Sequence, residues 1–298
     1  MSYLGIDIGG TNLKYAILDH NFQIQKSWQK KTVPCSDKDS LYDELCRGIL
    51  NEHIEFIGIS APGVVHPDTY KICSKAASSI EVMAHTNIKE EIEQRLHRPV
   101  VAINDGKAAA YCEVRRGNGK NTKSSAYWLI GTGIGGCICH GTEIITGVDG
   151  IAGEFSHIPL KLADGKVLSV GDLAAIHALE TNYNTDLPEK EKVYDPQEIC
   201  RRYLAGEKRA EKAVNEWIWY NVQGMYIITS FYNPEVICIG GAISREAWLL
   251  DKIRERFYES NYRFADILTT RIEPCRYGND ANIIGAVMYA QERLKKEL

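Results

Sequence analysis

The alternation of apolar and polar residues predicts that the chain begins with a series of strands. Apolar residues fill Tyr3 to Ile6, and from Leu13 to Leu18 they alternate with polar ones. A third strand is expected from Phe22 to Lys30, followed by a helix from Asp39 to Leu50 and a strand from Ile54 to Ser60.

In the middle of the chain, the spacing of apolar residues predicts two helices with one short strand between them. Apolar residues recur at positions 88, 92 and 96 of an expected helix from Asn87 to Leu96, with Asn87 as N-cap and Glu90 completing an approximate capping box. A buried strand is expected over residues 99–103. A helix from Gly106 to Arg116 should stop at the glycines that follow it.

The second half opens with strands and then becomes mostly helical. Strands are expected over residues 126–130, 134–140 and 236–239, and helices over 171–179, 196–204 and 207–230, with a final helix from Asp280 onward. The longest helix carries a broad apolar stripe, which predicts core packing. Residues 181–195 have the polarity of a surface loop, and residues 117–123 are rich in small polar residues and form a candidate hinge.

Composition narrows the classes of protein to which the chain can belong. Of its 298 residues, 44% are hydrophobic and 25% are charged, and the formal net charge of −4 gives no case for a nucleic-acid partner. No apolar run approaches the roughly 18 residues of a membrane-spanning helix, and the first residues lack a signal-peptide pattern. Nine cysteines without a repeated spacing favour reduced thiols and a cytoplasmic protein.

Candidate chemistry begins at the Gly9-Gly10 turn between the first two strands. Paired glycines permit positive φ, and their N–H groups can then point at one anion such as a phosphate. Asp7, at the end of the first strand, suits a hydrated Mg²⁺, and the Thr11 hydroxyl suits a phosphate. The alternative is a plain Gly-Gly hairpin that carries an exposed Asp.

Two further glycine loops repeat this plan. The first runs from Gly131 to Gly136 between two apolar strands, and the second, Gly240-Gly241, follows the expected strand over residues 236–239. Three such loops are typical of an ATP site built from two similar halves. The chain contains no Walker P-loop, and no Gly-x-Gly-x-x-Gly motif opens a helix after its first strand.

Two polar clusters are candidates for acid–base chemistry. Asn104-Asp105 lies between an expected strand and a helix, where α/β sheets bind ligands, but both residue types are also favoured helix N-caps. Glu154 and His157 follow a loop of small residues and can converge on neighbouring hydroxyls. The alternative for this pair is a surface Glu beside a histidine that is already hydrogen-bonded.

In this order the segments resemble the ROK family of sugar kinases, which belongs to the actin/hexokinase-like ATPase superfamily. The matching segments are Asp7 to Lys14, Ser60 to Val65, Asn104-Asp105, Gly131 to Gly136, Gly150 to His157 and Ile239 to Ala242. The resemblance implies an α/β fold of two actin/ribonuclease H-like domains with mixed sheets flanked by helices, and ATP and sugar in the cleft between them. We expect a small domain over residues 1–118, joined by the C-terminal helix at about 283–298, and a larger one over 119–282.

The resemblance also implies a role for each site residue. Asp105 would be the catalytic base, and Gly63, Asn104, Asp105, Glu154 and His157 would bind the sugar. ATP would be bound by Asp7, Gly9, Gly10, Thr11, Asn12, Lys14, Gly131, Thr132, Gly133, Gly135, Gly240 and Gly241. Asp7 would reach Mg²⁺ through water, so the expected cofactors are ATP and Mg²⁺.

Departures from the family pattern concern the sugar side of the site. No Cys occurs between Cys139 and Cys200, so the family's cysteine zinc motif is missing and we expect no zinc. Ala174 stands where the family usually has a sugar-contacting glutamate. Ser156 replaces the usual glycine of a Glu-x-Gly-His motif, and Ser79-Ile80 replaces a frequent Asn-Leu.

The implied activity is transfer of the γ-phosphate of ATP to a primary hydroxyl, O6 of a hexose, hexosamine or β-glucoside. The missing glutamate favours a β-glucoside or N-acetylmannosamine over free glucose, and a homodimer is the expected assembly. The alternative is a non-catalytic sugar-binding regulator or sensor of the same family. We expect no repressor-type helix-turn-helix, because the phosphate loop begins already at Asp7.

Overall fold

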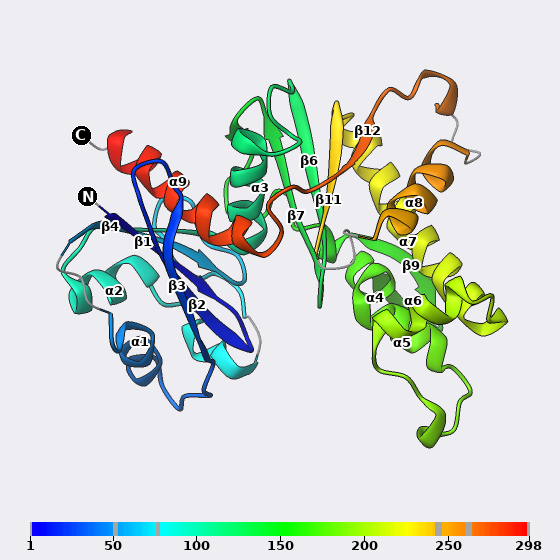
Figure 1. The fold of residues 1–298 in the computed structure, drawn as a ribbon, viewed down its shortest axis with the longest axis horizontal. Coiled ribbons are helices and arrows are strands. Elements are labelled where there is room, and N and C mark those ends of the chain that lie inside the picture. Colours follow the sequence, from blue (N-terminus) through cyan, green and yellow to red (C-terminus); the bar gives the residue numbers. More distant parts are fainter. Residues whose placement is uncertain (1, 50–52, 76–77, 242–245, 260–263, 297–298) are drawn as a thin grey trace. The chain divides into compact units, whose positions relative to one another are not determined.

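A computed structural model describes residues 2–49, 53–75, 78–241, 246–259 and 264–296 (Figure 1). Contacts along the chain divide it into two compact units, the first comprising Met1–Lys120, Thr142–Ala152 and Asn279–Leu298, and the second Asn121–Gly141 and Gly153–Gly278. Both units combine a mixed sheet with helices, which confirms the predicted α/β class. The hinge over residues 117–123 stays a prediction, as does the expected division at residue 118.

The first unit contains a five-stranded sheet in the order β3-β2-β1-β4-β5. Its strands are β1 (Ser2–Ile8), β2 (Asn12–Leu18), β3 (Ile24–Lys31), β4 (Ile54–Ala61) and β5 (Val100–Asn104). β1 pairs antiparallel with β2 but parallel with β4, and β4 pairs parallel with β5. The carboxyl ends of β1, β4 and β5 therefore meet at one edge of the sheet, where parallel sheets bind ligands.

Helices cover both faces of this sheet. Gly58 shows the contact on one face, and Tyr15 shows the contact on the other. The helices are α1 (Lys38–Cys46), α2 (Ile88–Leu96), α3 (Asp105–Arg116) and α9 (Ala281–Lys296). A Cβ on Gly58 would lie 2.5 Å from the carbonyl oxygen of Ala286, so α9 needs glycine on the face of β4 that it covers. Tyr15, on the opposite face from Ala16 and its partner Gly5, donates its hydroxyl to the carbonyl of Leu45 at the end of α1.

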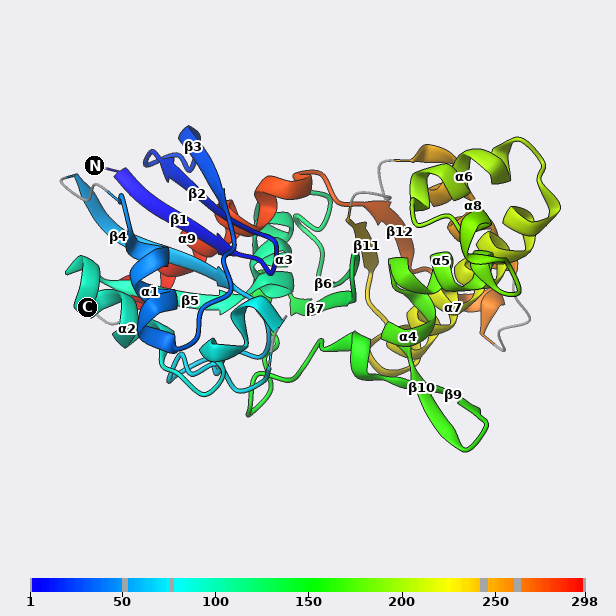
Figure 2. The same ribbon diagram turned by 90° about the horizontal axis from the view of Figure 1, so that it is seen from below.

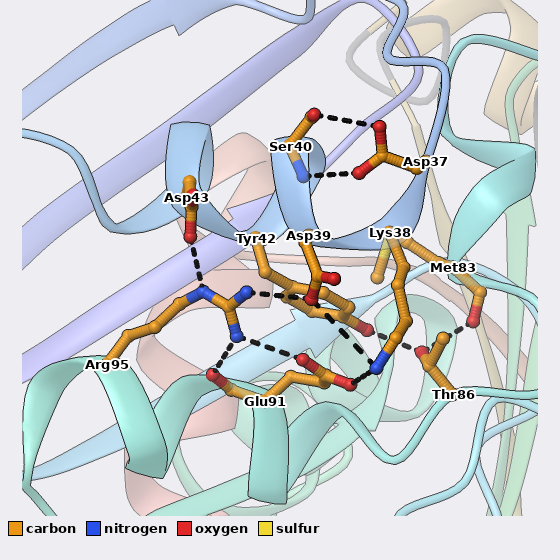
Figure 3. Close-up of polar contacts among 10 residues, drawn as sticks. All are labelled: Asp37, Lys38, Asp39, Ser40, Tyr42, Asp43, Met83, Thr86, Glu91 and Arg95. Atoms are coloured by element: carbon orange, nitrogen blue, oxygen red, sulfur yellow. Dashed lines mark hydrogen bonds and ion pairs between the residues drawn. The ribbon is translucent and has the colours of Figure 1, made fainter.

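An ion-pair network joins α1 to α2 (Figure 3). The Arg95 guanidinium contacts Asp43 at 2.7 Å, Glu91 at 2.9 Å and Asp39 at 3.1 Å. Lys38 pairs with the other oxygen of Glu91 at 2.5 Å. Burial acts to raise the pKa of Glu91, but hydrogen bonds from Lys38 and Arg95 outweigh it, so the pKa lies below its usual value.

The second sheet has the order β12-β11-β6-β7-β8, and its first four strands belong to the second unit. The strands are β6 (Ser124–Ile130), β7 (Ile134–His140), β8 (Glu143–Ile144), β11 (Val236–Gly240) and β12 (Arg271–Pro274). β9 (Pro159–Ala163) and β10 (Lys166–Ser169) form a separate hairpin (Figure 2). The helices are α4 (Val170–Ala174), α5 (Ile176–Asn184), α6 (Pro196–Leu204), α7 (Lys208–Tyr232) and α8 (Ala247–Glu259).

The apolar stripe of α7 forms the centre of the second core, as predicted. Trp217 and Met225 are fully buried, and Trp217 donates its indole N–H to the carbonyl of Ala175 at 3.0 Å. Trp128 of β6 packs against Gly224, where a Cβ would collide with its ring, and donates to Asn221 Oδ1 at 2.8 Å. Each buried indole N–H therefore has an acceptor, which burial of a polar group requires.

Three expected elements differ from the structure by more than two residues. The helix expected to reach Leu50, which lies outside the described residues, ends at Cys46, because Arg47 is extended and Gly48 after it has a φ of +76°. The helix expected over residues 171–179 is two helices, since Ala175 is extended and begins a new turn. The expected loop over residues 181–195 starts only after Asn184, whose side-chain amide bonds both the N–H and the carbonyl of Val193 at 2.8 Å.

Within the residues that the structure covers, no helix is both long and apolar enough to span a bilayer. None of the nine cysteines forms a disulfide. Cys137, Cys139 and Cys238 are fully buried in strands, as predicted for small core residues.

Candidate functional site

Asp7 ends β1 inside a cluster of polar side chains in the first unit. One carboxylate oxygen accepts hydrogen bonds from the Ser60 hydroxyl at 2.7 Å and the Asn282 amide at 3.2 Å. The other lies 3.3 Å from the ammonium of Lys14, its cross-strand neighbour in the β1–β2 register. Asp7 is only 6% exposed, so the alternative of an exposed hairpin Asp is wrong.

The turn from Gly9 to Asn12 connects β1 with β2. The Gly9 N–H donates to the carbonyl of Asn12 at 3.1 Å, and a Cβ on Gly9 would lie 3.0 Å from that oxygen. Neither Gly9 nor Gly10 has a left-handed φ, so the expectation of positive φ in this turn is wrong. Gly9 is favoured here by close backbone approach rather than by backbone handedness. The Thr11 side chain is exposed.

Gly63, Asn104 and Asp105 lie together at the edge of the first sheet. The Asn104 amide donates to the carbonyl of Gly63 at 2.9 Å and to Asp105 Oδ1 at 3.0 Å. The Asn104 oxygen accepts the N–H of Lys107 at 3.0 Å and so caps α3, as the N-cap alternative predicted. The Asp105 carboxylate also accepts the Gly106 N–H at 2.7 Å, which fixes its orientation. Both amide hydrogens of Asn104 are used, so only its oxygen remains to meet a substrate hydroxyl.

Lys107, two residues beyond Asp105, is a buried lysine for which no sequence pattern indicated a role. Its side chain is 3% exposed and donates to the carbonyl of Gly150 at 2.8 Å. Gly150 has a φ of +78°, and a Cβ there would lie 2.8 Å from the carbonyl oxygen of Val65. Lys107 thus ties α3 to the segment Thr142–Ala152 within the first unit.

In the second unit, the glycine loop after β6 is held by the start of α5. The Gly131 N–H donates to the carbonyl of Gly133 at 2.9 Å, and the Gly131 carbonyl accepts the Ile176 N–H at 3.0 Å. His177 Nδ1 lies 3.2 Å from the carbonyl oxygen of Thr132. The break at Ala175 therefore places the N-terminus of α5 beside this loop.

Gly240 and Gly241 end β11 next to the same loop. β11 pairs in parallel with β6, and Gly240 is the register partner of Leu129. A Cβ on Gly241, whose φ is +99°, would collide with the carbonyl of Ile130. The two glycine segments are therefore neighbours in the second unit, although they lie about a hundred residues apart in the chain. Ala242, which belongs to the matching family segment, lies outside the described residues.

Glu154 precedes and His157 ends a short 3₁₀ turn, η2 (Phe155–His157), in the second unit. The carbonyl of Glu154 accepts the His157 N–H at 3.2 Å, and the His157 side chain is exposed. Between them, Ser156 Oγ accepts the Ile134 N–H at 3.4 Å and fills space beside Gly133 and Gly171. The serine that replaces the family's glycine therefore contacts the glycine loop.

The Asp172 carboxylate interacts electrostatically with His157 and His177. Hydrogen bonds from the N–H and hydroxyl of Ser169 hold the pKa of Asp172 below its usual value, and the two imidazoles lower it further. The same bonds form the capping box that begins α4.

Ala174 is fully buried in the core of the second unit, so it opens no space at a surface. Its carbonyl accepts the Asn221 amide at 3.1 Å. The argument that a small residue at this position enlarges the sugar pocket therefore fails. Among the described residues, no three His, Cys, Asp or Glu side chains are grouped so that they could hold a metal ion.

The expected site residues thus form two groups, each within one unit. Asp7, the Gly9–Asn12 turn, Lys14, Gly63 and Asn104-Asp105 lie at the edge of the first sheet, while the Gly131–Gly135 loop, Glu154, His157 and Gly240-Gly241 belong to the second unit. Ser60 could have been found from the sequence, since it lies in a matching segment. Asn282 and Lys107 carry no sequence signal of their own.

Comparison with known proteins gives matches along the whole chain. A family model described as the ROK family matches residues 3–293. The chain is 28% identical over 305 residues to a β-glucoside kinase of Listeria innocua, with 100% of both chains covered. It is 26% identical to a glucokinase of Halalkalibacterium halodurans, which covers 95% of this chain and 93% of that one. The solved ROK family glucokinase of Streptomyces griseus, in complex with glucose and AMPPNP, has a TM-score of 0.81 and 25% identity and covers 98% of this chain and 100% of its own.

Proposed function

Because this chain belongs to the ROK family, we propose that it is an ATP-dependent sugar kinase that transfers the γ-phosphoryl group to a primary sugar hydroxyl, O6 of a hexose, hexosamine or β-glucoside. The observation that carries the proposal is the Asp105 carboxylate, held by Asn104 and Gly106 at the carboxyl edge of the first sheet. Relatives named as kinases of glucose and of β-glucosides support the reaction class.

We assign Asp105 as the general base. Its hydrogen bonds fix one carboxylate oxygen, so the group keeps one orientation toward an incoming hydroxyl. Asn104 holds that orientation and offers its remaining lone pair to a neighbouring sugar hydroxyl. Gly63, Glu154 and His157 complete the proposed sugar-binding set. Phosphoryl transfer needs mainly positioning and charge neutralisation, which suits a site with one base.

The nucleotide would be bound by the backbone of the glycine segments. We assign the Gly9–Asn12 turn with Lys14, and the Gly131–Gly135 loop, to its phosphates, and Gly240-Gly241 to the adenosine side. Asp7 fits Mg²⁺ through water, because it offers one carboxylate already held by Ser60 and Asn282, and Mg²⁺ keeps several of its waters. When bound, Mg²⁺ would supply charge neutralisation at the phosphate oxygens.

The identity of the sugar is a separate question that a direct comparison decides. The preference for a β-glucoside or N-acetylmannosamine over glucose rested on Ala174, which is a core residue. We therefore propose only the substrate class, a hexose, hexosamine or β-glucoside. The test compares glucose, cellobiose and N-acetylmannosamine as substrates with ATP and Mg²⁺, and measures ADP release in a coupled assay. Sugar-dependent ADP release supports the kinase. If the protein bound these sugars without any turnover, the alternative of a non-catalytic sensor would replace it.

The role of Asp105 has its own test. Asp105→Asn keeps an oxygen that can accept the Gly106 N–H but removes the base, so we expect kcat to fall roughly 10²–10⁴-fold with nucleotide affinity little changed. Asp164→Asn is the matched control, because Asp164 is an exposed turn residue with a φ of +50°, which Asn tolerates well. Near-normal turnover in Asp105→Asn would remove Asp105 from this role.

A further inference from the structure

Two side-chain hydroxyls fix the backbone of the turn between β1 and β2. We propose that Thr32 and Ser79 are positioning residues that aim the N–H groups of Gly10 and Thr11 at the phosphate chain of the nucleotide. The inference rests on the proposed function and adds to it two residues that no motif marks as part of the nucleotide site.

The contacts are short and come from separate segments. Thr32, directly after β3, donates its hydroxyl to the carbonyl of Gly9 at 2.7 Å, and its N–H donates to the carbonyl of Thr11 at 2.9 Å. Ser79, in the 3₁₀ turn η1 (Ser78–Met83), donates its hydroxyl to the carbonyl of Gly10 at 2.6 Å. Both side chains are half-buried, and Ile80 beside Ser79 is fully buried, which anchors η1.

Holding a carbonyl determines the direction of the next N–H. In a planar trans peptide unit, the C=O of one residue and the N–H of the next point in opposite directions. Thr32 therefore sets the direction of the Gly10 N–H, and Ser79 sets that of the Thr11 N–H. In the part of the chain that the structure describes, neither of these N–H groups donates to a protein acceptor. Two donors thus point away from the hydroxyls and are available to an anion.

The turn needs such bonds because its own sequence leaves it pliable. Glycine has the largest conformational freedom of any residue, and ordering it on binding costs free energy. Donors that already point at the developing charge contribute more than donors that must reorganise. Thr32 and Ser79 provide that order before the nucleotide arrives.

The test removes each hydroxyl with little change in volume. In Thr32→Val and Ser79→Ala, we expect the dissociation constant for ADP with Mg²⁺, measured by titration calorimetry, to rise about 3- to 10-fold, the range for one lost hydrogen bond. The KM for the sugar should change less than about twofold. Thr32→Ser and Ser79→Thr keep the hydroxyl and should bind ADP like the original chain. Ser36→Ala is the matched control, because the Ser36 hydroxyl is exposed and donates to the exposed Asp37.

The outcomes separate this inference from the proposed function. Unchanged ADP affinity in both Thr32→Val and Ser79→Ala would overturn the inference. So would equal losses in the hydroxyl-keeping variants, together with a lowered melting temperature, because the residues would then act only through stability. If the original chain phosphorylated no sugar but its ADP affinity depended on both hydroxyls, the proposed function would fail and the inference would stand.

Discussion

We predict that Arg95→Met lowers the free energy of unfolding of the first unit by about 2 kcal/mol at pH 7 and low salt. The magnitude follows from the partners of the guanidinium. Asp39 and Asp43 have side chains 68% and 65% exposed, so each pair contributes roughly 0.2–1 kcal/mol. Glu91 is only 12% exposed, and its charge-assisted bond contributes roughly 1.5 kcal/mol. Met keeps an apolar stem but also loses the cation–π contact of the Arg95 guanidinium, whose carbon lies 5.7 Å from the centroid of the Tyr42 ring.

Urea unfolding of Arg95→Met and the original chain, followed by circular dichroism, measures the difference. Arg47→Met is the matched control: Arg47 lies at the end of α1, is 74% exposed and pairs with one carboxylate, so we expect a loss below about 0.5 kcal/mol. In about 0.5 M salt the difference between Arg95→Met and the original chain should shrink, because screening weakens its exposed pairs.

The stability that Glu91 contributes through its ion pairs depends on pH with a defined sign. The pKa of Glu91 is lower in the folded protein than in the unfolded chain, so its contribution is fully present above the unfolded value, near 4.5. It is lost as the pH falls through the lower, folded value. The difference between Arg95→Met and the original chain should therefore be constant from pH 6 to 8 and decrease below about pH 4. Equal losses in Arg95→Met and Arg47→Met, or a difference that is unaffected by both salt and acid, would refute the reasoning.

Three further predictions concern other parts of the molecule. Asp7→Asn should raise the Mg²⁺ concentration for half-maximal activity by about 10-fold or more without changing the sugar KM; an unchanged Mg²⁺ requirement would contradict the assignment. Gly58→Ala should cost about 3 kcal/mol or more in urea unfolding, because its Cβ would lie 2.5 Å from the Ala286 oxygen. Trp128→Phe should cost about 3 kcal/mol in urea unfolding, since it leaves Asn221 Oδ1 buried without its donor.

Much of the fold follows from local patterns in the sequence. The helix at Asn87 was predicted from its cap, and the structure has the Asn87 side chain accepting the Glu90 N–H at 3.3 Å. The stripe on α7 predicted its buried face because helical periodicity records which side is covered. Glycines at strand ends predict where ligand-binding turns lie, and that interpretation stays a prediction.

The parts that were missed depend on contacts between distant segments. The β9–β10 hairpin carried a local signal, Asp164-Gly165, with φ of +50° and +74°, which is the pair that favours tight hairpin turns. Its exposed, weakly alternating strands concealed that signal. The break at Ala175 had none, because it is made by bonds to Gly131 and Trp217 that only the folded chain brings together.

The packing of α9 on the first sheet has a consequence for how this protein is made. Gly5 and Gly58 lie under α9, and Asp7 receives a bond from Asn282, 275 positions further along the chain. On the ribosome, the first five strands emerge long before their cover, so an apolar sheet face stays bare while the whole second unit is being translated. The nascent chain cannot complete the Asp7 cluster until α9 has left the exit tunnel, which makes premature termination before residue 281 destructive to the part of the protein that was synthesised first.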